Sequence, residues 1–247
     1  NGKSLFDYMI SDKVISPNPA DISEQLLYLP CYQPNNSQRP VGAVTAKSAH
    51  KLPEDCFVFC CFNQSFKITP AVFAIWMRIL QKSLGSVLWL LDCNMWSKAN
   101  LTNTAEKAGV DPARLIFAPR VGIAEHLERH AHADLFLDTS PYNAHTSASD
   151  ALWMGLPLLT CTGDTFASRV ASSLLQHLEL PQLIAGNWQE YEQKALFYAQ
   201  NADALDKIKQ GLAAQNKNAN LFNPSQFARN LEQQYQQIWQ RHLPVID

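Results

Sequence analysis

The feature that most constrains the fold is an alternation of short apolar runs with longer helical segments, which starts near residue 55 and continues almost to the end of the chain. The apolar runs have the length of strands and few polar positions, a pattern typical of strands buried on both faces of a sheet. The segments between them carry apolar residues at helical spacing. Strands that alternate with helices in this way form a parallel sheet covered by helices on both faces, so the sequence predicts an α/β fold.

The expected elements follow from this pattern. Strands are predicted at residues 56–62, 87–91, 115–117 and 135–137, after Pro157, and at 183–184. Helices are predicted from Thr69 and Pro70 onward and at residues 102–108, 123–132, 146–154, 166–177, 189–200, 202–215 and 224–242, the last with Phe227, Leu231, Tyr235, Ile238 and Trp239 as its apolar face.

Residues 1–45 do not share this alternation. LFDYMI suggests a strand, ADISEQLLYL suggests a short helix, and LPCYQPNNSQRPVG is rich in residues that interrupt regular structure. We therefore expect two units, residues 1–45 and residues 46–247, with a linker at the end of the first.

Composition restricts the function classes. With 47% hydrophobic residues the chain can form a large core, and a net charge of −2 offers no basic surplus for a general nucleic-acid partner. No apolar run approaches the roughly 20 residues that span a membrane, so no membrane partner is expected. The chain opens with NGKSLFDY, which leaves targeting open.

The six cysteines are expected to be buried free thiols. Most lie in apolar runs such as CFVFCCF, and no CxxC pair is matched by a second one as in a zinc site. Free thiols favour a reducing compartment, so we expect a cytoplasmic protein.

Residues 134–169 combine the features of an anion site. A buried strand ends at Asp138, a loop rich in small and polar residues follows, and Thr146 and Ser147 offer N-cap hydroxyls to the next helix. Such a unit places backbone N–H groups and the positive end of a helix dipole at the carboxyl end of a strand, where phosphates bind most often. Simple helix capping is the alternative interpretation of these hydroxyls.

Three segments follow predicted strands and are expected to meet at one edge of the sheet: residues 62–67, 118–126 and 138–150. In the first, Lys67 can place its ammonium on a phosphate and Gln64 can donate to a phosphate oxygen, unless both are simply solvated. In the last, Asp150 can accept from the two hydroxyls of a ribose. Arg169 is either a further anion contact or a surface residue.

The histidines of IAEHLERHAHADL raise the question of a metal. His126 and His130 are four residues apart and can share a helix face, but there is no HExxH arrangement and no third ligand close in sequence. We expect no metal there; Arg129 and His126 can instead face one anion. The chain has no GxSxG, GxGxxG or Walker sequence, so neither a hydrolase elbow nor a generic glycine motif supports a function.

Four ordered stretches carry a resemblance to a known family. PEDCFVFCCFNQSFKITPAVFAIWMRIL, GSVLWLL, DLFLDTSPYNAHTSASDALWMGLPLLT and GDTFASRVASSLL resemble the carboxyl-terminal catalytic half of the protein O-linked N-acetylglucosamine transferases. YMISDKVISP resembles the segment that ends the amino-terminal lobe in that family, so the resemblance covers nearly the whole chain.

The resemblance implies a GT-B glycosyltransferase, with two Rossmann-like lobes and the donor held mainly by the carboxyl-terminal lobe. This chain would be that Rossmann-like lobe, a parallel sheet with helices on both faces, with residues 1–45 as the end of the first lobe and the linker. The implied reaction is inverting transfer of GlcNAc from UDP-GlcNAc to Ser or Thr of a protein or peptide acceptor, without metal or other cofactor. The family's catalytic histidines and tetratricopeptide repeats would lie upstream of residue 1.

The resemblance also assigns residues. Gln64 and Lys67 match the Gln and Lys on the donor diphosphate, where Lys67 would offset charge on the UDP leaving group. The uridine would be met by the backbone of Val121, by His126 and by the nearby Arg129. The phosphate-binding helix start would be His145, Thr146 and Ser147, and Asp150 would hold the ribose hydroxyls.

The chain departs from the family pattern at three places. Ile123 stands where a Lys is frequent near the uracil, which predicts weaker stacking. Ser147, Ala148 and Ser149 replace Thr-Gly-Met, and Tyr142 replaces a smaller residue in a position that can reshape the sugar pocket.

Two alternatives remain open on the sequence. The first is a related transferase with another donor sugar or an Asn acceptor. The second is a stand-alone UDP-sugar-binding module without transferase activity.

Overall fold

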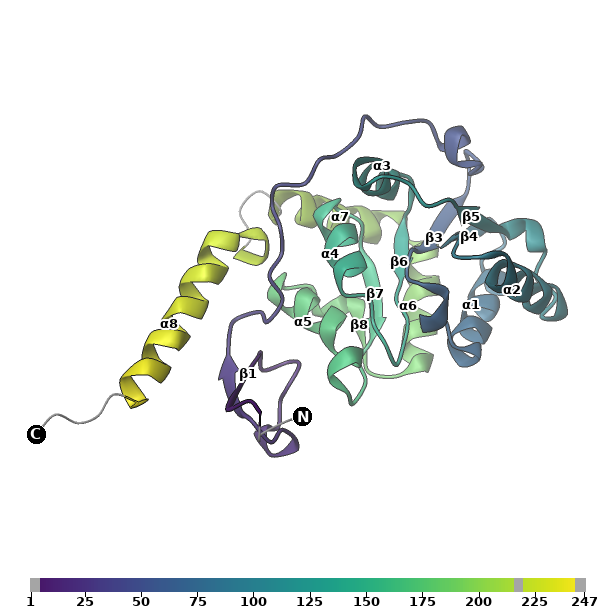
Figure 1. The fold of residues 1–247 in the computed structure, drawn as a ribbon. Helices are drawn as coiled ribbons and strands as arrows, with labels where there is room; N and C mark the ends of the chain where they lie inside the picture. The colour runs from purple at the N-terminus through teal and green to yellow at the C-terminus, as the bar shows by residue number, and fades with distance from the viewer. Residues whose placement is uncertain (1–4, 216–219, 243–247) are drawn as a thin grey trace, which may run out of the picture.

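The computed structural model describes residues 5–215 and 220–242. Its centre is a six-stranded, fully parallel sheet in the order β5-β4-β3-β6-β7-β8 (Figure 1). The strands are β3 (Phe57–Cys61), β4 (Ser86–Leu91), β5 (Leu115–Ala118), β6 (Leu135–Leu137), β7 (Leu158–Cys161) and β8 (Ile184–Ala185). The chain first runs outward from β3 to β5 and then returns to β6 beside β3. This reversal of direction is a topological switch point, where open parallel sheets bind their ligands.

Helices cover both faces of the sheet, as the alternation predicts. The helices are α1 (Pro70–Lys82), α2 (Met95–Lys107), α3 (Ile123–Glu128), α4 (Thr146–Trp153), α5 (Val170–His177), α6 (Trp188–Gln200), α7 (Ala202–Gln215) and α8 (Pro224–His242). Because parallel crossovers are right-handed, α1 and α2 lie on one face and α3, α4 and α5 on the other. Helix α6 packs against α1 and therefore completes the first face. The predicted Rossmann-like α/β fold is confirmed.

Local sequence signals explain where the helices begin. Thr69 accepts a hydrogen bond from the N–H of Val72 at the start of α1, with Pro70 at the first helical position. Asn94 and Asn187 cap α2 and α6 in the same way. The Asn94 cap starts α2 at Met95, seven residues before the predicted start at 102. The prediction began too late because Ala105 is the single buried residue of this helix, which leaves it without a clear apolar stripe.

The core lies between the sheet and its helices. Trp76 of α1 and Trp89 of β4 are fully buried. The indole N–H of Trp76 donates to the hydroxyl of Tyr191 on α6 at 3.2 Å, and Tyr191 donates in turn to the backbone oxygen of Asp138 at 3.0 Å. This chain of hydrogen bonds anchors the end of β6, from which the candidate site is built, in the core.

The first residues form a small unit of their own. Strands β1 (Tyr8–Ser11) and β2 (Gln25–Tyr28) pair in parallel as a separate two-stranded sheet. The predicted helix over ADISEQLLYL is therefore wrong: the segment contains only the end of a 3₁₀ turn at Pro19–Asp21, and then β2. Pairing with β1, together with burial of Leu27 and Leu29, overrides the local helical pattern.

An extended segment connects this unit to the main domain. Residues 29–46 contain no helix or strand and cross over the α4 and α3 side to a 3₁₀ turn, Lys47–His50 (Figure 1). The backbone N–H of Gly42 donates to the oxygen of Ala124 on α3 at 3.0 Å. The linker is thus attached to the domain beside the switch point.

The carboxyl-terminal helix projects from the domain. Figure 1 shows α8 extending toward the region of β1, and the hydroxyl of Tyr8 lies 3.0 Å from Nε2 of His242. The described part of α8 has no buried residue, and Tyr235 and Trp239 on its predicted apolar face are exposed. The predicted helix is confirmed, but its apolar face is only partly covered, since Phe227, Leu231 and Ile238 are half-buried.

Other predicted boundaries shift slightly. The segment 123–132 is α3 followed by a 3₁₀ turn at Arg129–His132, and the segment 166–177 is a 3₁₀ turn at Phe166–Ser168 followed by α5.

Candidate nucleotide-sugar site

The site lies at the carboxyl ends of β3 and β6, on both sides of the switch point. Asn63 lies two residues after the end of β3 and is buried. Its amide nitrogen donates to the hydroxyl of Thr139 at 2.8 Å, and its amide oxygen accepts from the hydroxyl of Ser147 at 2.8 Å. One side chain thereby connects the end of β3 to the loop after β6 and to the first turn of α4.

Asp138 shapes the loop after β6. Its carboxylate is buried and accepts hydrogen bonds from the N–H groups of Thr139 at 2.8 Å and Ala144 at 2.6 Å, and from the hydroxyl of Thr160 at 2.7 Å. Burial raises the pKa of this carboxyl to about 7, against the opposing effect of the hydrogen bonds. Asp138 thus holds residues 139–144 in the shape that presents α4 to the site.

Lys67 reaches across the switch point. It ends the 3₁₀ turn Ser65–Lys67 after β3, and its ammonium donates to the backbone oxygen of Asn143 at 2.8 Å. The ammonium also lies over the ring of Tyr142, 3.8 Å from its centre, a cation–π arrangement. Burial lowers its pKa, while the charge of Asp138 raises it. A half-buried cation is therefore present where the sequence predicted a phosphate contact.

Gln64 lies on the other side of the same loop. Its amide oxygen accepts from the guanidinium of Arg120, after β5, at 2.9 Å and faces the thiol of Cys93, after β4, at 3.8 Å. Gln64 therefore joins the three strand ends on this half of the sheet. Arg120, an exposed cation at this edge, was not singled out from the sequence.

The start of α4 differs in detail from the prediction. His145, not Thr146 or Ser147, occupies the N-cap position, and its side chain makes no capping hydrogen bond. The prediction that the hydroxyls of Thr146 and Ser147 cap this helix is therefore wrong. Thr146 is the exposed first residue of the helix, and the hydroxyl of Ser147 donates to Asn63. The first-turn N–H groups of a helix have no partner within that helix and remain available to an anion.

His145 itself borders the loop. Its Nε2 lies 3.4 Å from the backbone oxygen of Ala167, and its ring meets that of Tyr142 edge-on with centroids 4.9 Å apart. Burial lowers its pKa. His145 therefore lies between Tyr142 and the start of α4.

Asp150 and His126 come together from α4 and α3. His126 Nε2 lies 3.7 Å from Asp150 Oδ2, and the carboxylate is almost fully buried. The other carboxylate oxygen forms an ion pair with Arg39 of the linker, which also donates to the hydroxyl of Ser149 at 3.2 Å. Arg39 was missed because a lone Arg in an irregular segment carries no pattern that indicates its partner.

Val121 and Arg129 border a cavity of about 330 Å³ beside this pair, which is also lined by Trp89 and Phe117. Arg129 is buried; it donates to the backbone oxygen of Pro119 at 2.8 Å and lies over the ring of Phe62, 4.3 Å from its centre. Burial lowers its pKa to about 10. Arg129 also contacts the imidazole Nδ1 of His126, so the two predicted neighbours do face each other.

Two further expectations concern residues near the site. Arg169 donates to the backbone oxygens of Gly163 at 2.9 Å and Ile15 at 3.3 Å, so it connects two loops. His130 is fully buried and directs Nδ1 to the backbone oxygen of His126 at 2.8 Å, and the two imidazole rings meet edge-on with centroids 4.9 Å apart.

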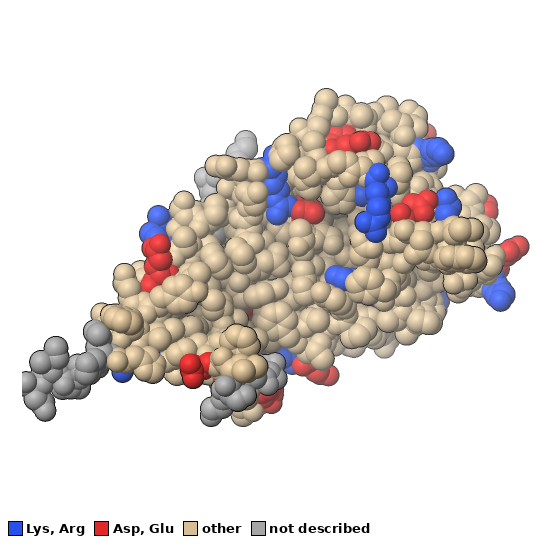
Figure 2. Space-filling view, viewed as in Figure 1, with Lys and Arg blue, Asp and Glu red and all other residues tan. Residues whose placement is uncertain are grey.

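The cysteines, the charged side chains and the helix lengths were the other features considered from the composition. All six cysteines are free, four of them buried and Cys56 and Cys93 half-buried. On the face shown in Figure 2, Lys and Arg side chains are scattered among Asp and Glu rather than gathered in one patch. None of the helices in the described ranges is long and apolar enough to cross a membrane.

A Rossmann-like sheet gathers a cation, a helix start and a His–Asp pair at its switch point, and its fold is that of one lobe of a GT-B glycosyltransferase. The comparisons with known proteins identify the family. The family model described as Glycosyl transferase family 41 matches residues 35–231, and the chain belongs to this family.

Individual relatives agree. The chain is 35% identical to a probable UDP-N-acetylglucosamine–peptide N-acetylglucosaminyltransferase, SEC, of Arabidopsis thaliana, over 98% of this chain and 26% of that protein. It is 34% identical to the corresponding Caenorhabditis elegans transferase, over 81% of this chain and 17% of that protein. The chain therefore spans about a quarter or less of the length of these relatives.

Solved structures support the same assignment. An O-GlcNAc transferase mutant of Thermobaculum terrenum superposes with a TM-score of 0.86 at 27% identity, over 94% of this chain and 45% of that one. Sucrose-phosphate synthase of Thermosynechococcus elongatus has a TM-score of 0.71 at 13% identity, over 97% of this chain and 61% of that one, which shows a shared fold alone.

Proposed function

We propose that this chain is the donor-binding lobe of a protein O-GlcNAc transferase, which binds UDP-GlcNAc for inverting transfer of GlcNAc to Ser or Thr. The observation that carries the proposal is that two groups border α4 at the switch point: Lys67 contacts the loop before α4, and His126 contacts Asp150 within α4. Family membership and the names of the relatives support the same activity.

The three groups suit the three parts of the donor. Lys67, Gln64 and the first turn of α4, with His145, Thr146 and Ser147, supply a cation and N–H or O–H donors for the diphosphate. Asp150 supplies a carboxylate for the ribose hydroxyls. The cavity bordered by Val121, with Arg129 and His126 beside it, receives the uracil.

The chemistry of transfer needs stabilisation of the leaving group. The acceptor hydroxyl oxygen forms a bond to the anomeric carbon on the face opposite the phosphate, and the bond from that carbon to the diphosphate oxygen breaks. The electron pair of the broken bond stays on UDP, while the acceptor proton passes to a base or to solvent. Lys67 and the α4 N–H groups are placed to offset this charge, so transfer proceeds without a metal at the diphosphate.

The acceptor side is assigned to the rest of the protein. Because the chain spans only 26% and 17% of two relatives, we place the upstream catalytic lobe and tetratricopeptide repeats outside these residues. Residues 1–45 are then the end of the first lobe and the linker, and residues 46–247 the donor lobe. A protein or peptide acceptor and a cytoplasmic location complete the proposal, the latter supported by the six free thiols.

Titration calorimetry of UDP into this chain tests the proposal. We expect UDP to bind and Asp150→Asn to weaken binding about tenfold or more, because the ribose hydroxyls lose a charged acceptor. Asp203→Asn, on the exposed surface of α7, is the matched control and should leave affinity unchanged. Equal affinity of the Asp150 variant and the parent would refute the site.

Competition among UDP-GlcNAc, UDP-GalNAc and UDP-glucose then distinguishes the donor sugars. Preference for UDP-glucose would favour a related transferase with another donor.

A further inference from the structure

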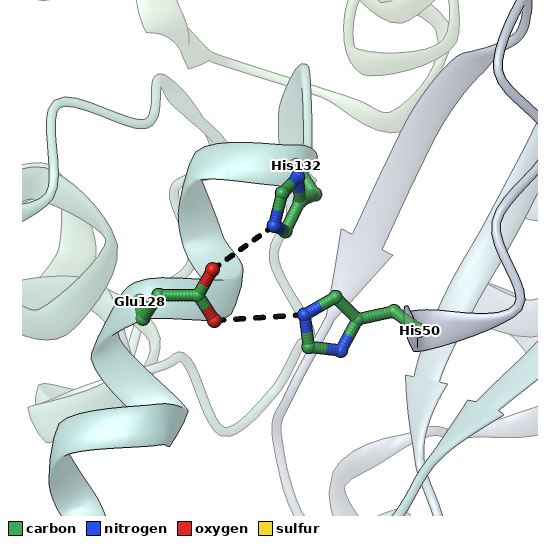
Figure 3. Close-up of side chains that lie close together, drawn as sticks. All are labelled: His50, Glu128 and His132. Atoms are coloured by element: carbon green, nitrogen blue, oxygen red, sulfur yellow. Dashed lines mark hydrogen bonds and ion pairs between the residues drawn. The ribbon is translucent and has the colours of Figure 1, made fainter. Parts of the chain in front are cut away.

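A second cluster of chemically active side chains lies on the α3 side of the domain, apart from the diphosphate groups. It consists of His50 at the end of the 3₁₀ turn Lys47–His50, Glu128 at the end of α3, and His132 at the end of the 3₁₀ turn Arg129–His132 (Figure 3). The three residues come from the turn that follows the linker and from the α3 segment. The fold brings them together, since His50 is 78 positions from Glu128 in the sequence (128 − 50).

The spacing of the donor atoms suits one small cation. His132 Nε2 lies 3.1 Å from Glu128 Oε1, His50 Nε2 lies 3.5 Å from Glu128 Oε2, and one donor atom from each residue falls within 4.8 Å of the others. With metal–ligand bonds of about 2.0–2.1 Å, tetrahedral zinc separates its ligand atoms by about 3.3 Å. The cluster therefore needs only a small adjustment to hold such an ion.

A fourth oxygen adjoins the three residues. Thr45 Oγ1 lies 2.9 Å from His50 Nε2 and 3.4 Å from His132 Nε2. The hydroxyl and the N–H of Thr45 both donate to Glu128 Oε1, at 2.9 and 2.6 Å. These two hydrogen bonds hold one carboxylate oxygen and leave the other directed at His50.

The burial of Glu128 supplies an independent reason to expect a cation. Its side chain is only 1% exposed, and Oε2 receives no hydrogen bond from the described part of the chain. A buried carboxylate oxygen without a donor is costly unless a cation neutralises it. The adjacent Arg129 does not serve, because its guanidinium is directed to Pro119 and Phe62.

We propose that His50, Glu128 and His132 bind one divalent transition metal ion of the zinc type, through both Nε2 atoms and the carboxylate. Two imidazoles favour zinc over magnesium or calcium, which prefer oxygen ligands. Thr45 or a water molecule would complete the coordination. The His126–His130 pair considered from the sequence takes no part.

The bound ion would fasten the linker to α3. Thr45 belongs to the linker and His50 to the turn that follows it, while Glu128 and His132 belong to the α3 side. Thr45 and His50 also line the cavity bordered by Val121 and Arg129. A metal here would therefore fix one wall of the cavity that we assign to the uracil; only this consequence rests on the proposed function.

Zinc titration of the chelator-treated chain, in competition with a chromophoric chelator, tests the site. We expect one zinc ion per chain, and affinity reduced about tenfold or more in His50→Gln, His132→Gln and the isosteric Glu128→Gln, since loss of even an outer-shell partner costs 10–100-fold. His242→Gln is the control, because His242 at the end of α8 contacts Tyr8 and is not part of the cluster. Circular dichroism establishes that each variant is folded.

Cobalt substitution separates this site from a thiol site. Co²⁺ held by two imidazoles and a carboxylate gives visible d–d bands without a thiolate charge-transfer band. Zinc should also raise the Tm of the parent chain and of the His242 variant but not that of the three ligand variants. Unchanged zinc affinity in folded ligand variants, no zinc binding by the parent, or a thiolate band would each overturn the proposal, and none of these results bears on UDP binding at Lys67.

Discussion

The ammonium of Lys67 and the backbone oxygen of Asn143 lie 2.8 Å apart, although 76 residues separate them in the sequence. Lys67 follows β3 and Asn143 follows β6, the two strands that flank the switch point. The contact holds a cation at the edge where the loops of both strands meet. It accounts for how the fold positions a lysine at this edge without a glycine-rich phosphate loop.

Lys67→Met should weaken UDP binding while leaving uridine binding nearly unchanged. The lysine meets only the phosphates in the proposed site, and loss of a charge-assisted contact of about 1.5–3 kcal/mol corresponds to roughly 10–100-fold in affinity. Titration calorimetry with both ligands measures the difference. Lys82→Met, which removes an exposed lysine paired with Glu192, should change neither affinity. An equal loss for uridine would show that Lys67 acts on the fold rather than on phosphate.

His126→Ala should weaken UDP and uridine by similar factors of about 3–10. His126 lies beside Asp150 and Arg129, on the ribose and base side of the proposed site, and not beside Lys67. The expected loss corresponds to about 0.7–1.4 kcal/mol. The measurement is the same pair of titrations, with His242→Ala as control. A loss of affinity for UDP but not for uridine would show that His126 contacts the diphosphate instead.

Arg39→Gln should strengthen UDP binding by about 3–10-fold. Arg39 pairs with one oxygen of the Asp150 carboxylate, so the ribose hydroxyls must displace or share this cation. Removing Arg39 frees the carboxylate from a largely buried ion pair that exists only without the ligand, and the expected gain in binding is about 0.7–1.4 kcal/mol. In an Asp150→Asn background the gain should vanish, which a double-mutant cycle measures. Weaker binding would instead mean that Arg39 contacts the donor.

Asp138→Asn should destabilise the domain by about 1–3 kcal/mol at pH 7. The amide nitrogen of Asn would face a backbone N–H or a hydroxyl that now donates to the carboxylate, leaving a buried donor unsatisfied. Urea unfolding followed by circular dichroism gives the free energy. Asp203→Asn on the surface of α7 should have no measurable effect.

The same carboxyl makes stability depend on pH. Its pKa is raised by burial from 3.8 to about 7, so the folded state binds the proton more tightly than the unfolded chain. This contribution is complete below pH 3.8 and is lost as pH rises through about 7, at up to about 1.4 kcal/mol per pH unit. The stability difference between the parent and Asp138→Asn should therefore be larger at pH 5 than at pH 7. An unchanged difference would show that the hydrogen bonds outweigh burial and keep the carboxyl ionised.

Local patterns sufficed for most of the framework. Continuous apolar runs predicted the strands at 57–61, 86–91 and 135–137 within one or two residues, because burial on both faces excludes polar side chains. Thr69 and Pro70 predicted the start of α1 from capping alone. The helix predicted over ADISEQLLYL was wrong because this segment forms a strand through pairing with β1, a contact that no local sequence pattern indicates.

The predicted site residues form two groups in the structure. Lys67 meets the loop before His145, and His126 meets Asp150 and Arg129, because parallel strands carry their following loops to one edge. Their roles toward a donor stay predictions. Thr146 and Ser147 are residue types that often cap helices, but α4 begins at Thr146, so His145 occupies the N-cap position.

By itself, the sequence determined the alternating α/β framework, the helix start set by Thr69 and Pro70, and the strand ends where polar residues lie. These features depend on periodicity and capping within a few residues. Only the tertiary structure decided that Arg39 meets Asp150, that Asn63 joins Thr139 to Ser147, and that His50 meets Glu128 and His132. Such contacts join segments far apart in the chain, and their geometry exists only once the strands have paired and the helices have packed on the sheet.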